Sequence, residues 1–317
     1  MRATWRYLKW EAHKLYKRAL REVCSELYRE TESDTRTSIM VAGTARSGTT
    51  WLADIIASQI PCRIMFEPFH SRKVQAFRQF HYFQYMKPGE KNNALRSYCQ
   101  KVFTGEIRDR WIDQQVDLLF PKCRLIKEIR ANLFLGWIQV NFPEIPILFI
   151  VRNPCAVVLS RMQLSWWTDE DIAPFLSQPK LIDDFLVDKL EVIRRATTIE
   201  EKHAIIWCVS NLVPIRQFRS RGLTVVFYEH LCVQPEVEVR RMFGTIDQVY
   251  DGSIFRSVIR PSATSRHTSA IVTGEDKVMR WKQVLSTEQI DNILRVVRDF
   301  GLDYIYGDSA APLVAEP

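Results

Sequence analysis

A short apolar run that leads through a glycine-containing turn into a helical pattern constrains the fold of this chain more than any other feature. The run SIMVAGT (residues 38–44) reads as a buried strand, and TTWLADIIASQ (residues 49–59) has the apolar spacing of a helix. Residues 145–154 and 223–231 are two more clear strand candidates, and residues 124–130 are a shorter one. Apolar strands separated by helices, with almost no alternating hairpins, predict a mainly parallel sheet with both faces covered.

This alternation predicts an α/β fold in which a P-loop-like, mainly parallel central sheet is flanked by helices within a single domain. We expect three parts along the chain: an amphipathic helix at 1–34, the domain at 35–308 and a disordered tail at 309–317. Near the end of the domain, Ser286 and Gln289 have the spacing of a capping box that would begin a helix. Ligands of such sheets bind at the carboxyl ends of the strands, so the polar clusters after the strands are the candidate site.

The net charge and the cysteine pattern limit the partners and the compartment that we expect for this protein. The net charge is +7 and the pI is near 9.0, so the protein attracts anionic partners and raises their local concentration. The charge alone does not indicate whether these partners are nucleotides, nucleic acids or anionic lipids. The seven cysteines are scattered and show no CxxC pair, so we expect neither a disulfide framework nor a zinc site, and a reducing compartment fits best. Three of them lie in or beside apolar runs and are expected to be small core hydrophobes: Cys123, Cys155 and Cys208.

The start of the chain has neither the apolar core of a secretory signal nor the roughly 18 continuous apolar residues of a spanning helix. Its apolar residues recur at helical spacing, at Trp5, Leu8, Ala12, Leu15, Ala19, Val23 and Leu27. Basic residues lie between them, at Arg6, Lys9, Lys14, Lys17, Arg18 and Arg21. Such a helix either packs on its own domain or a partner chain, or lies on a membrane. We therefore expect a cytoplasmic protein, with peripheral membrane contact through residues 1–33 as the open alternative.

The turn from Gly43 to Thr50 has the features of a phosphate-binding loop. Its two glycines let the backbone aim successive N–H groups at one point, and the N-terminus of the next helix attracts an anion. The frame is that of a P-loop, but Thr49 occupies the lysine position, and the cation is Arg46, whose guanidinium can hold two oxygens of a phosphate or sulfonate. The alternative is a structural turn without a ligand. The candidate binding residues are Thr44, Ala45, Arg46, Ser47, Gly48, Thr49 and Thr50.

A second polar cluster lies in VRNPCAVVLSR, where Arg152 closes a buried strand and Ser160 follows nearly two helical turns beyond Pro154. Both residues could meet a second phosphate at a distance from the first. Taken alone, an Arg at a strand end and a Ser inside a helix are explained more simply by structure. The strand end offers no convincing acidic magnesium ligand, which, with the missing loop lysine, argues against a site that hydrolyses ATP or GTP.

Together the two segments resemble the sulfotransferase family, in patches from residue 38 to about 305. GTARSGTTWL resembles the 5′-phosphosulfate loop of that family, which commonly has Lys where Arg46 stands. VRNPCAVVLSR resembles its 3′-phosphate motif, whose Arg and Ser fall on Arg152 and Ser160.

Finer features of the resemblance point to two branches. Phe66-Glu67-Pro68 resembles an element of the carbohydrate 6-O-sulfotransferases, as does Thr264-Ser265-Arg266 with the later Arg280-Trp281 and Leu285. RLIKEIR matches the small-molecule cytosolic branch at Lys127, but the catalytic His of that branch falls on Ile129.

The resemblance implies a PAPS-dependent O-sulfotransferase, closest in motifs to the carbohydrate enzymes, that yields PAP and a sulfate ester. It implies that Arg152, Ser160 and Arg266 also hold the donor. Arg46 is the candidate cation at the bridging oxygen and Lys127 a second one, while Glu67 is the candidate general base, with Glu128 as its competitor. The implied partner is a hydroxyl-bearing carbohydrate, glycolipid or natural product, and neither a metal nor a nucleic acid is expected.

Two other functions remain open from the sequence. A P-loop-type kinase of a small molecule or sugar would need ATP with magnesium. A non-catalytic basic module would bind polyanions in a salt-sensitive way without turnover.

Overall fold

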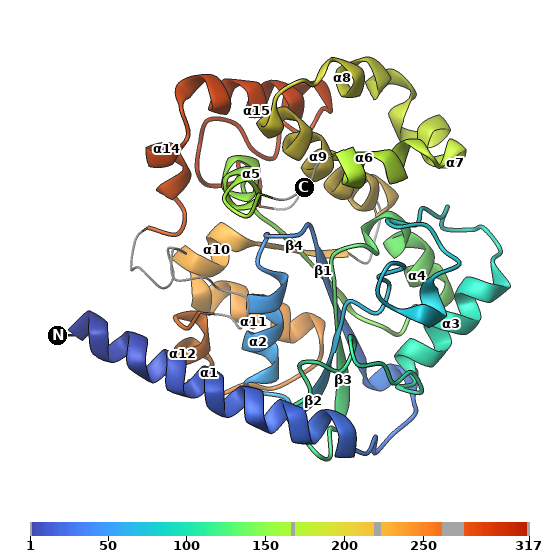
Figure 1. Ribbon diagram of the computed structural model, residues 1–317, viewed down its shortest axis with the longest axis vertical. Coiled ribbons are helices and arrows are strands. Elements are labelled where there is room, and N and C mark those ends of the chain that lie inside the picture. The colour runs from blue at the N-terminus through green and yellow to red at the C-terminus, as the bar shows by residue number, and fades with distance from the viewer. Residues whose placement is uncertain (1, 166–168, 219–222, 262–275, 316–317) are drawn as a thin grey trace.

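The computed structural model describes residues 2–165, 169–218, 223–261 and 276–315 (Figure 1). A five-stranded sheet in the order β2-β3-β1-β4-β5 forms its centre, and every neighbouring pair is parallel. The strands are β1 (Ser38–Gly43), β2 (Cys62–Phe66), β3 (Cys123–Glu128), β4 (Ile147–Val151) and β5 (Leu223–Phe227). The predicted α/β class with a parallel central sheet is confirmed.

Helices make up most of the rest. The α-helices are α1 (Arg2–Leu27), α2 (Thr49–Ala57), α3 (Asn93–Phe103), α4 (Leu135–Asn141), α5 (Pro154–Met162), α6 (Asp169–Leu176), α7 (Pro179–Leu181), α8 (Leu190–Arg195), α9 (Ile199–Gln217), α10 (Tyr228–Val233), α11 (Pro235–Thr245), α12 (Ile254–Val258), α14 (Arg280–Val284) and α15 (Thr287–Asp299). Short 3-10 or π turns are η1 (Thr35–Thr37), η2 (Gln75–Phe77), η3 (Asn132–Phe134), η4 (Ile182–Leu186) and η5 (Val187–Lys189). No helix within these described ranges is long and apolar enough to cross a membrane.

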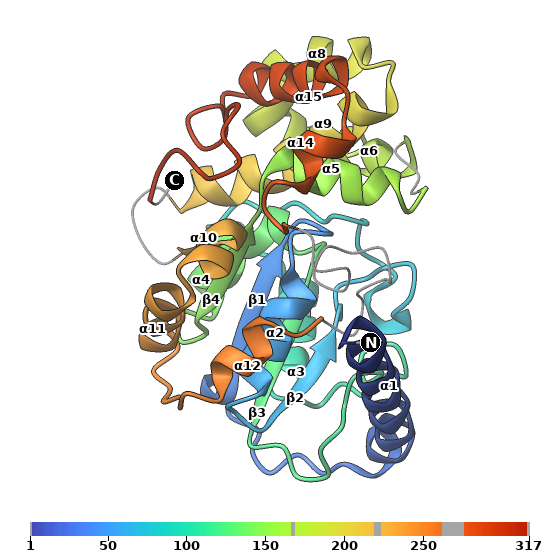
Figure 2. The same ribbon diagram turned by 90° about the vertical axis from the view of Figure 1, so that its left-hand side faces the viewer.

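Both faces of the sheet are buried, as near-continuous apolar strands require. Successive side chains of a strand point to opposite faces. Met40 and Ala42 of β1 therefore join one core with α3, α4, α5, α9 and α15, whereas Ile39 and Val41 join the other with α2, α11 and α12. In Figure 2, α2 and α12 lie in front of the strands. The predicted capping box of α15 is confirmed, because the hydroxyl of Ser286 accepts the Gln289 N–H and the Gln289 side chain accepts the Ser286 N–H.

One strand is shorter than expected, and another was not expected. The third clear strand ends at Phe227, and Tyr228 begins α10, so the expectation of a strand up to residue 231 is wrong. β2 was not expected at all, because Arg63 interrupts its apolar pattern. Arg63 is nevertheless fully buried, with Asp113 Oδ1 2.7 Å and Glu30 Oε1 2.7 Å from its guanidinium. A buried charge is tolerated where such partners replace water.

The end of the described chain lies against the domain. The Ser309 carbonyl accepts a hydrogen bond from Asn153, Ala310 is buried, and the Leu313 N–H donates to the Ile305 carbonyl. These contacts differ from the disordered tail expected from residue 309 onwards.

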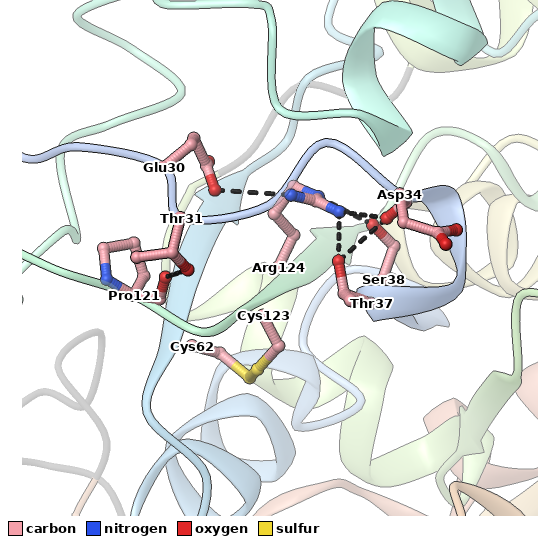
Figure 3. The surroundings of a disulfide bond; sticks show 9 residues. All are labelled: Glu30, Thr31, Asp34, Thr37, Ser38, Cys62, Pro121, Cys123 and Arg124. Carbon is pink, nitrogen blue, oxygen red and sulfur yellow. Dashed lines mark hydrogen bonds and ion pairs between the residues drawn. A yellow bond between two sulfur atoms is a disulfide. The ribbon is translucent and has the colours of Figure 1, made fainter.

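Cys62 and Cys123 form a disulfide (Figure 3). They are the first residues of β2 and β3 and lie opposite each other in the parallel register. The expectation that the cysteines are unpaired is therefore wrong for these two, and Cys123 is not a simple core hydrophobe, whereas Cys155 and Cys208 are buried free thiols. Disulfides persist in oxidising compartments, so this bond argues against the expected reducing compartment.

Candidate active site at the carboxyl ends of the strands

The strand order brings the predicted polar clusters to one edge of the sheet. After β1 the chain crosses to β2 on one side, and after β3 it crosses to β4 on the other side of β1. The change of direction occurs at β1, and such switch points open a crevice at the carboxyl ends of the strands. The loop after β1 and the segment after β4 follow neighbouring strands at this point.

The loop after β1 turns through two left-handed residues, Arg46 at φ 78° and Gly48 at φ 104°. Non-glycine residues seldom adopt this conformation, and when they do they are often at functional sites. At Gly48, a Cβ atom would also lie 2.9 Å from Cδ2 of Tyr228. Thr44 starts the turn, since its carbonyl accepts the Ser47 N–H at 3.0 Å and its hydroxyl accepts a hydrogen bond from Asn211 at 3.0 Å.

This loop fits an oxyanion. α2 begins at Thr49 without any side-chain cap, so the N–H groups of its first turn are available to a ligand. The hydroxyl oxygen of Ser47 is buried and has no hydrogen-bond partner among the described residues, and an unpaired buried hydroxyl is costly unless a ligand completes it. Thr49 and Thr50 are also buried beside it, while Ala45 adds only a small side chain.

The two predicted anion-binding segments are in direct contact. Arg46 Nε donates a hydrogen bond to Ser160 Oγ at 3.0 Å, and Arg152 Nη1 donates to the Arg46 carbonyl at 3.2 Å. The side chains that the sequence placed in two separate motifs therefore share one region of the molecule.

The Arg152 guanidinium is held by its neighbours. Its Cζ lies 4.1 Å from the centre of the Tyr228 ring, and that ring packs against Trp51 of α2 with centroids 5.0 Å apart. Arg152 Nη2 also approaches the Lys277 carbonyl at 3.4 Å. The Arg152 side chain is thus oriented by residues from three segments.

Asn153 and Glu229 fix the start of α5. The Asn153 side chain caps the helix by accepting the N–H groups of Cys155 and Ala156, and Pro154 occupies the first turn. The Asn153 N–H donates to Glu229 at 3.0 Å, and the Tyr306 hydroxyl donates to the other oxygen of that carboxylate at 2.7 Å. Burial raises the pKa of Glu229 against the effect of these bonds.

Glu67 directly follows β2 and is held by two cations. Its carboxylate lies 2.6 Å from Lys127 Nζ and forms a second ion pair with Arg130. Burial alone would raise its pKa, but the charges and hydrogen bonds of Lys127 and Arg130 outweigh burial and hold the pKa of Glu67 below its ordinary value. Glu67 is therefore ionised, and in this arrangement it is a weak base.

Glu128, the competing base, has a different environment. It is fully buried, and its oxygens accept the backbone N–H groups of Phe69, Ile129 and Arg130 at 2.8–3.0 Å. Burial, with a smaller contribution from Glu67, raises its pKa to about 6. These bonds tie together the loops after β2 and β3. Ile129, at the position of the missing His, is buried.

A cluster of three rings, those of His70, Tyr82 and Trp111, lies near Glu67. His70 is 5% exposed, and its Nδ1 has no hydrogen-bond partner within the described part of the chain. The rings of Tyr82 and Trp111 each lie 5.3 Å from its ring. Burial, assisted by the charge of Arg130, lowers the pKa of His70 to about 3, so the imidazole is neutral. Tyr82 and Trp111 are partly exposed. Most other aromatic side chains of this region are buried in the core, including Phe69, Phe77, Phe83 and Tyr85.

Sequence reasoning missed Arg130 and Tyr228. Tyr228 directly follows β5 and Arg130 is the second residue after β3, so the rule that ligands gather at the carboxyl ends would have pointed to them. Arg266 lies outside the described residues. Within the described ranges, no three His, Cys, Asp or Glu side chains are grouped as metal ligands would be.

The family described as "Sulfotransferase family" matches residues 38–251. Among solved structures, the sulfotransferase domain from the curacin biosynthetic pathway is 12% identical and aligns over 83% of this chain and 96% of its own, with a TM-score of 0.46. The sulfotransferase domain of the Synechococcus PCC 7002 olefin synthase is 13% identical, over 83% and 94%, with a TM-score of 0.46. Mouse sulfotransferase SULT7A1 complexed with PAP is 13% identical, over 92% and 90%, with a TM-score of 0.45.

No curated protein matches this chain in sequence. The family match spans more than half of the chain and includes the turn after β1, the ion pairs of Glu67 and the strand end at Arg152. The chain therefore belongs to the sulfotransferase family.

Proposed function

We propose that this protein transfers the sulfuryl group of PAPS to a hydroxyl of a carbohydrate or glycoconjugate. The family assignment supports PAPS as the donor and PAP as the product. The observation that carries the proposal is the hydrogen bond from Arg46 to Ser160. This bond joins the loop after β1, which is suited to a 5′-phosphosulfate, to the segment after β4, which is suited to a 3′-phosphate. A nucleotide phosphorylated at both positions needs a binding site for each phosphate.

The proposed donor site divides between these two segments. The N–H groups at the start of α2 and the hydroxyls of Ser47, Thr49 and Thr50 hold the 5′-phosphate. Arg152 and Ser160 hold the 3′-phosphate, which distinguishes PAPS from ATP-like nucleotides. Arg46 lies between the two and is the first candidate for the cation that stabilises the departing nucleotide.

Lys127 links the donor to the base. During transfer, a bond forms between the acceptor oxygen and sulfur, the bond from sulfur to the bridging phosphate oxygen breaks, and the acceptor proton passes to a base. Lys127 now pairs with Glu67. If Lys127 turns to the bridging oxygen, Glu67 loses one of its two cations and its proton affinity rises. Glu67 would thus become a stronger base only when the donor is bound.

The carbohydrate acceptor rests on two features. Phe66-Glu67-Pro68 resembles an element of carbohydrate sulfotransferases. Next to Glu67, the partly exposed rings of Tyr82 and Trp111 offer faces on which a sugar can stack.

Thermal unfolding with nucleotides tests the donor site. A ligand that binds only the native state stabilises it by mass action, so PAP should raise the melting temperature far more than AMP or ATP. Arg152→Ala should remove the preference of PAP over AMP, while the exposed Arg256→Ala should keep it. Equal shifts by PAP and AMP in the wild type would overturn the assignment of the donor, and an unchanged preference in Arg152→Ala would overturn the role of that residue.

The acceptor is tested separately with ³⁵S-labelled PAPS and a panel of oligosaccharides, glycolipids, phenols and natural-product alcohols. Labelled oligosaccharide or glycolipid is expected. Label found only on phenols or simple alcohols would refute the carbohydrate acceptor but leave sulfuryl transfer standing.

A further inference from the structure

The N-terminal helix α1 leaves a stripe of apolar side chains uncovered. Leu15, Tyr16, Val23 and Leu27 are 65%, 62%, 54% and 56% exposed. At 3.6 residues per turn, these four positions fall within roughly a third of the circumference of the helix. We call them the α1 stripe. Exposed large apolar residues scattered singly are ordinary, but a continuous set on one helix face indicates a surface that is covered by something else.

A different side of the helix attaches it to the domain. Cys24 and Tyr28 are almost completely buried and pack with Val116. Lys17 pairs with Asp117 at 2.6 Å. The sequence alone left open whether the apolar residues of this helix pack on its own domain. Cys24 and Leu20 do, whereas the exposed residues of the α1 stripe do not.

Contacts after the helix hold its C-terminal end. Glu30 pairs with Arg124 at 3.3 Å (Figure 3). It also pairs with Arg63 at 2.7 Å, and Arg124 donates to the Glu32 carbonyl at 2.6 Å. Arg63 and Arg124 are register partners on β2 and β3. The helix is therefore anchored to the sheet while the α1 stripe stays exposed.

The basic charge of residues 1–21 indicates what covers the α1 stripe. Residues 1–21 contain seven Lys or Arg and one Glu, and the apolar spacing of the α1 stripe continues in sequence through Trp5, Leu8 and Ala12. Glu22 and Glu26 lie only at the C-terminal end, where Arg18 approaches Glu22 at 3.4 Å. A second copy of the chain would bring two strongly basic segments together, which electrostatic repulsion opposes. A surface of anionic lipids instead attracts the charges and covers the apolar side chains.

We propose that α1 lies in the plane of a membrane that contains anionic lipids and buries the α1 stripe at its surface. The catalytic domain is then held beside acceptors on that surface. This binding does not depend on sulfuryl transfer, so it can be measured without PAPS.

Vesicle sedimentation with the full-length protein tests the proposal. The protein should bind vesicles of phosphatidylcholine mixed with phosphatidylserine, and bind phosphatidylcholine alone far less. Raising the salt from about 0.1 M to about 1 M should weaken the binding, because the screening length falls from about 10 Å to about 3 Å. The triple variant Leu15→Gln, Tyr16→Gln and Val23→Gln should lower the partition coefficient by at least about tenfold, since three exposed apolar side chains lose their burial in lipid.

A matched triple variant controls for surface hydrophobicity. Val233→Gln, Val249→Gln and Ile259→Gln change side chains that are 68%, 89% and 71% exposed elsewhere, and should bind vesicles like the wild type. Equal loss of binding in both triple variants would overturn the proposal. So would sedimentation of a wild-type dimer that only the α1 variant dissociates, with no vesicle binding, because a second copy would then be the occupant.

Discussion

At the scale of single residues, two carboxylates at neighbouring strand ends have opposite environments. Two cations hold Glu67 ionised, whereas burial raises the pKa of Glu128 to about 6. The sequence identified both as candidate bases and could not choose between them. The difference lies in the Lys127 and Arg130 side chains that pair with Glu67 and in the complete burial of Glu128 near Glu67, and neither is visible as a sequence pattern.

The pH dependence of turnover separates the two carboxylates. A base works in its ionised form, so the acid limb of kcat/KM for PAPS reports its pKa in the free enzyme, where Lys127 still pairs with Glu67. If Glu67 is the base, kcat/KM should not fall as the pH drops from 8 to about 5.5, because its pKa lies below the ordinary value of 4.5. If Glu128 is the base, kcat/KM should halve near pH 6.

Replacement completes this test. Glu67→Gln should lower kcat by about 10² to 10⁴ while PAP still stabilises the protein, since the donor site keeps its cations. The exposed Glu236→Gln should have no effect on kcat. A Glu67→Gln variant with wild-type kcat would exclude Glu67 as the base.

At the scale of elements, the strand–turn–helix units could be predicted and their side-chain partners could not. β1, β3, β4, α2 and α15 follow the expected apolar periods and capping signals. β2 was missed because Arg63 looks like a surface residue until its distant partners, Asp113 and Glu30, are known. The contact between the two anion-binding segments likewise depends on strand order, which periodicity does not give.

The tight packing of the loop after β1 against α10 leads to a prediction for Gly48→Ala. The new Cβ would meet Tyr228 Cδ2 at 2.9 Å, at a φ of 104° that alanine rarely adopts. Moving Tyr228 would also move Arg152, which lies over its ring. PAP affinity measured by calorimetry should fall by at least about tenfold, equivalent to about 1.4 kcal/mol. Gly252→Ala, whose Cβ meets nothing within 4 Å, should keep wild-type affinity, and a Gly48→Ala variant that does the same would refute this account of the loop.

At the scale of the whole molecule, the disulfide and the candidate site lie at opposite ends of the strands. Cys62 and Cys123 begin β2 and β3, whereas Glu67 and Arg130 follow the ends of the same two strands. The disulfide was not predictable, because the two cysteines are 61 residues apart and Cys62 belongs to β2, the strand that the apolar pattern did not reveal. Next to Cys123, Arg124 binds Glu30 and the segment after α1. The disulfide thus stabilises the part of the sheet to which the N-terminal helix is anchored.

The disulfide should therefore contribute to stability rather than to catalysis. Replacing Cys62 and Cys123 by Ser should lower the free energy of unfolding by about 2–4 kcal/mol, because the unfolded chain is no longer cross-linked across a long loop. Guanidinium unfolding of the wild type with a reducing agent should match the double variant, and Cys232→Ser, which changes a free cysteine, should unfold like the oxidised wild type. Thiol titration of the denatured, non-reduced wild type should find the five free cysteines. Seven titratable thiols would show that the bond does not form, and would restore the reducing compartment as the expected location.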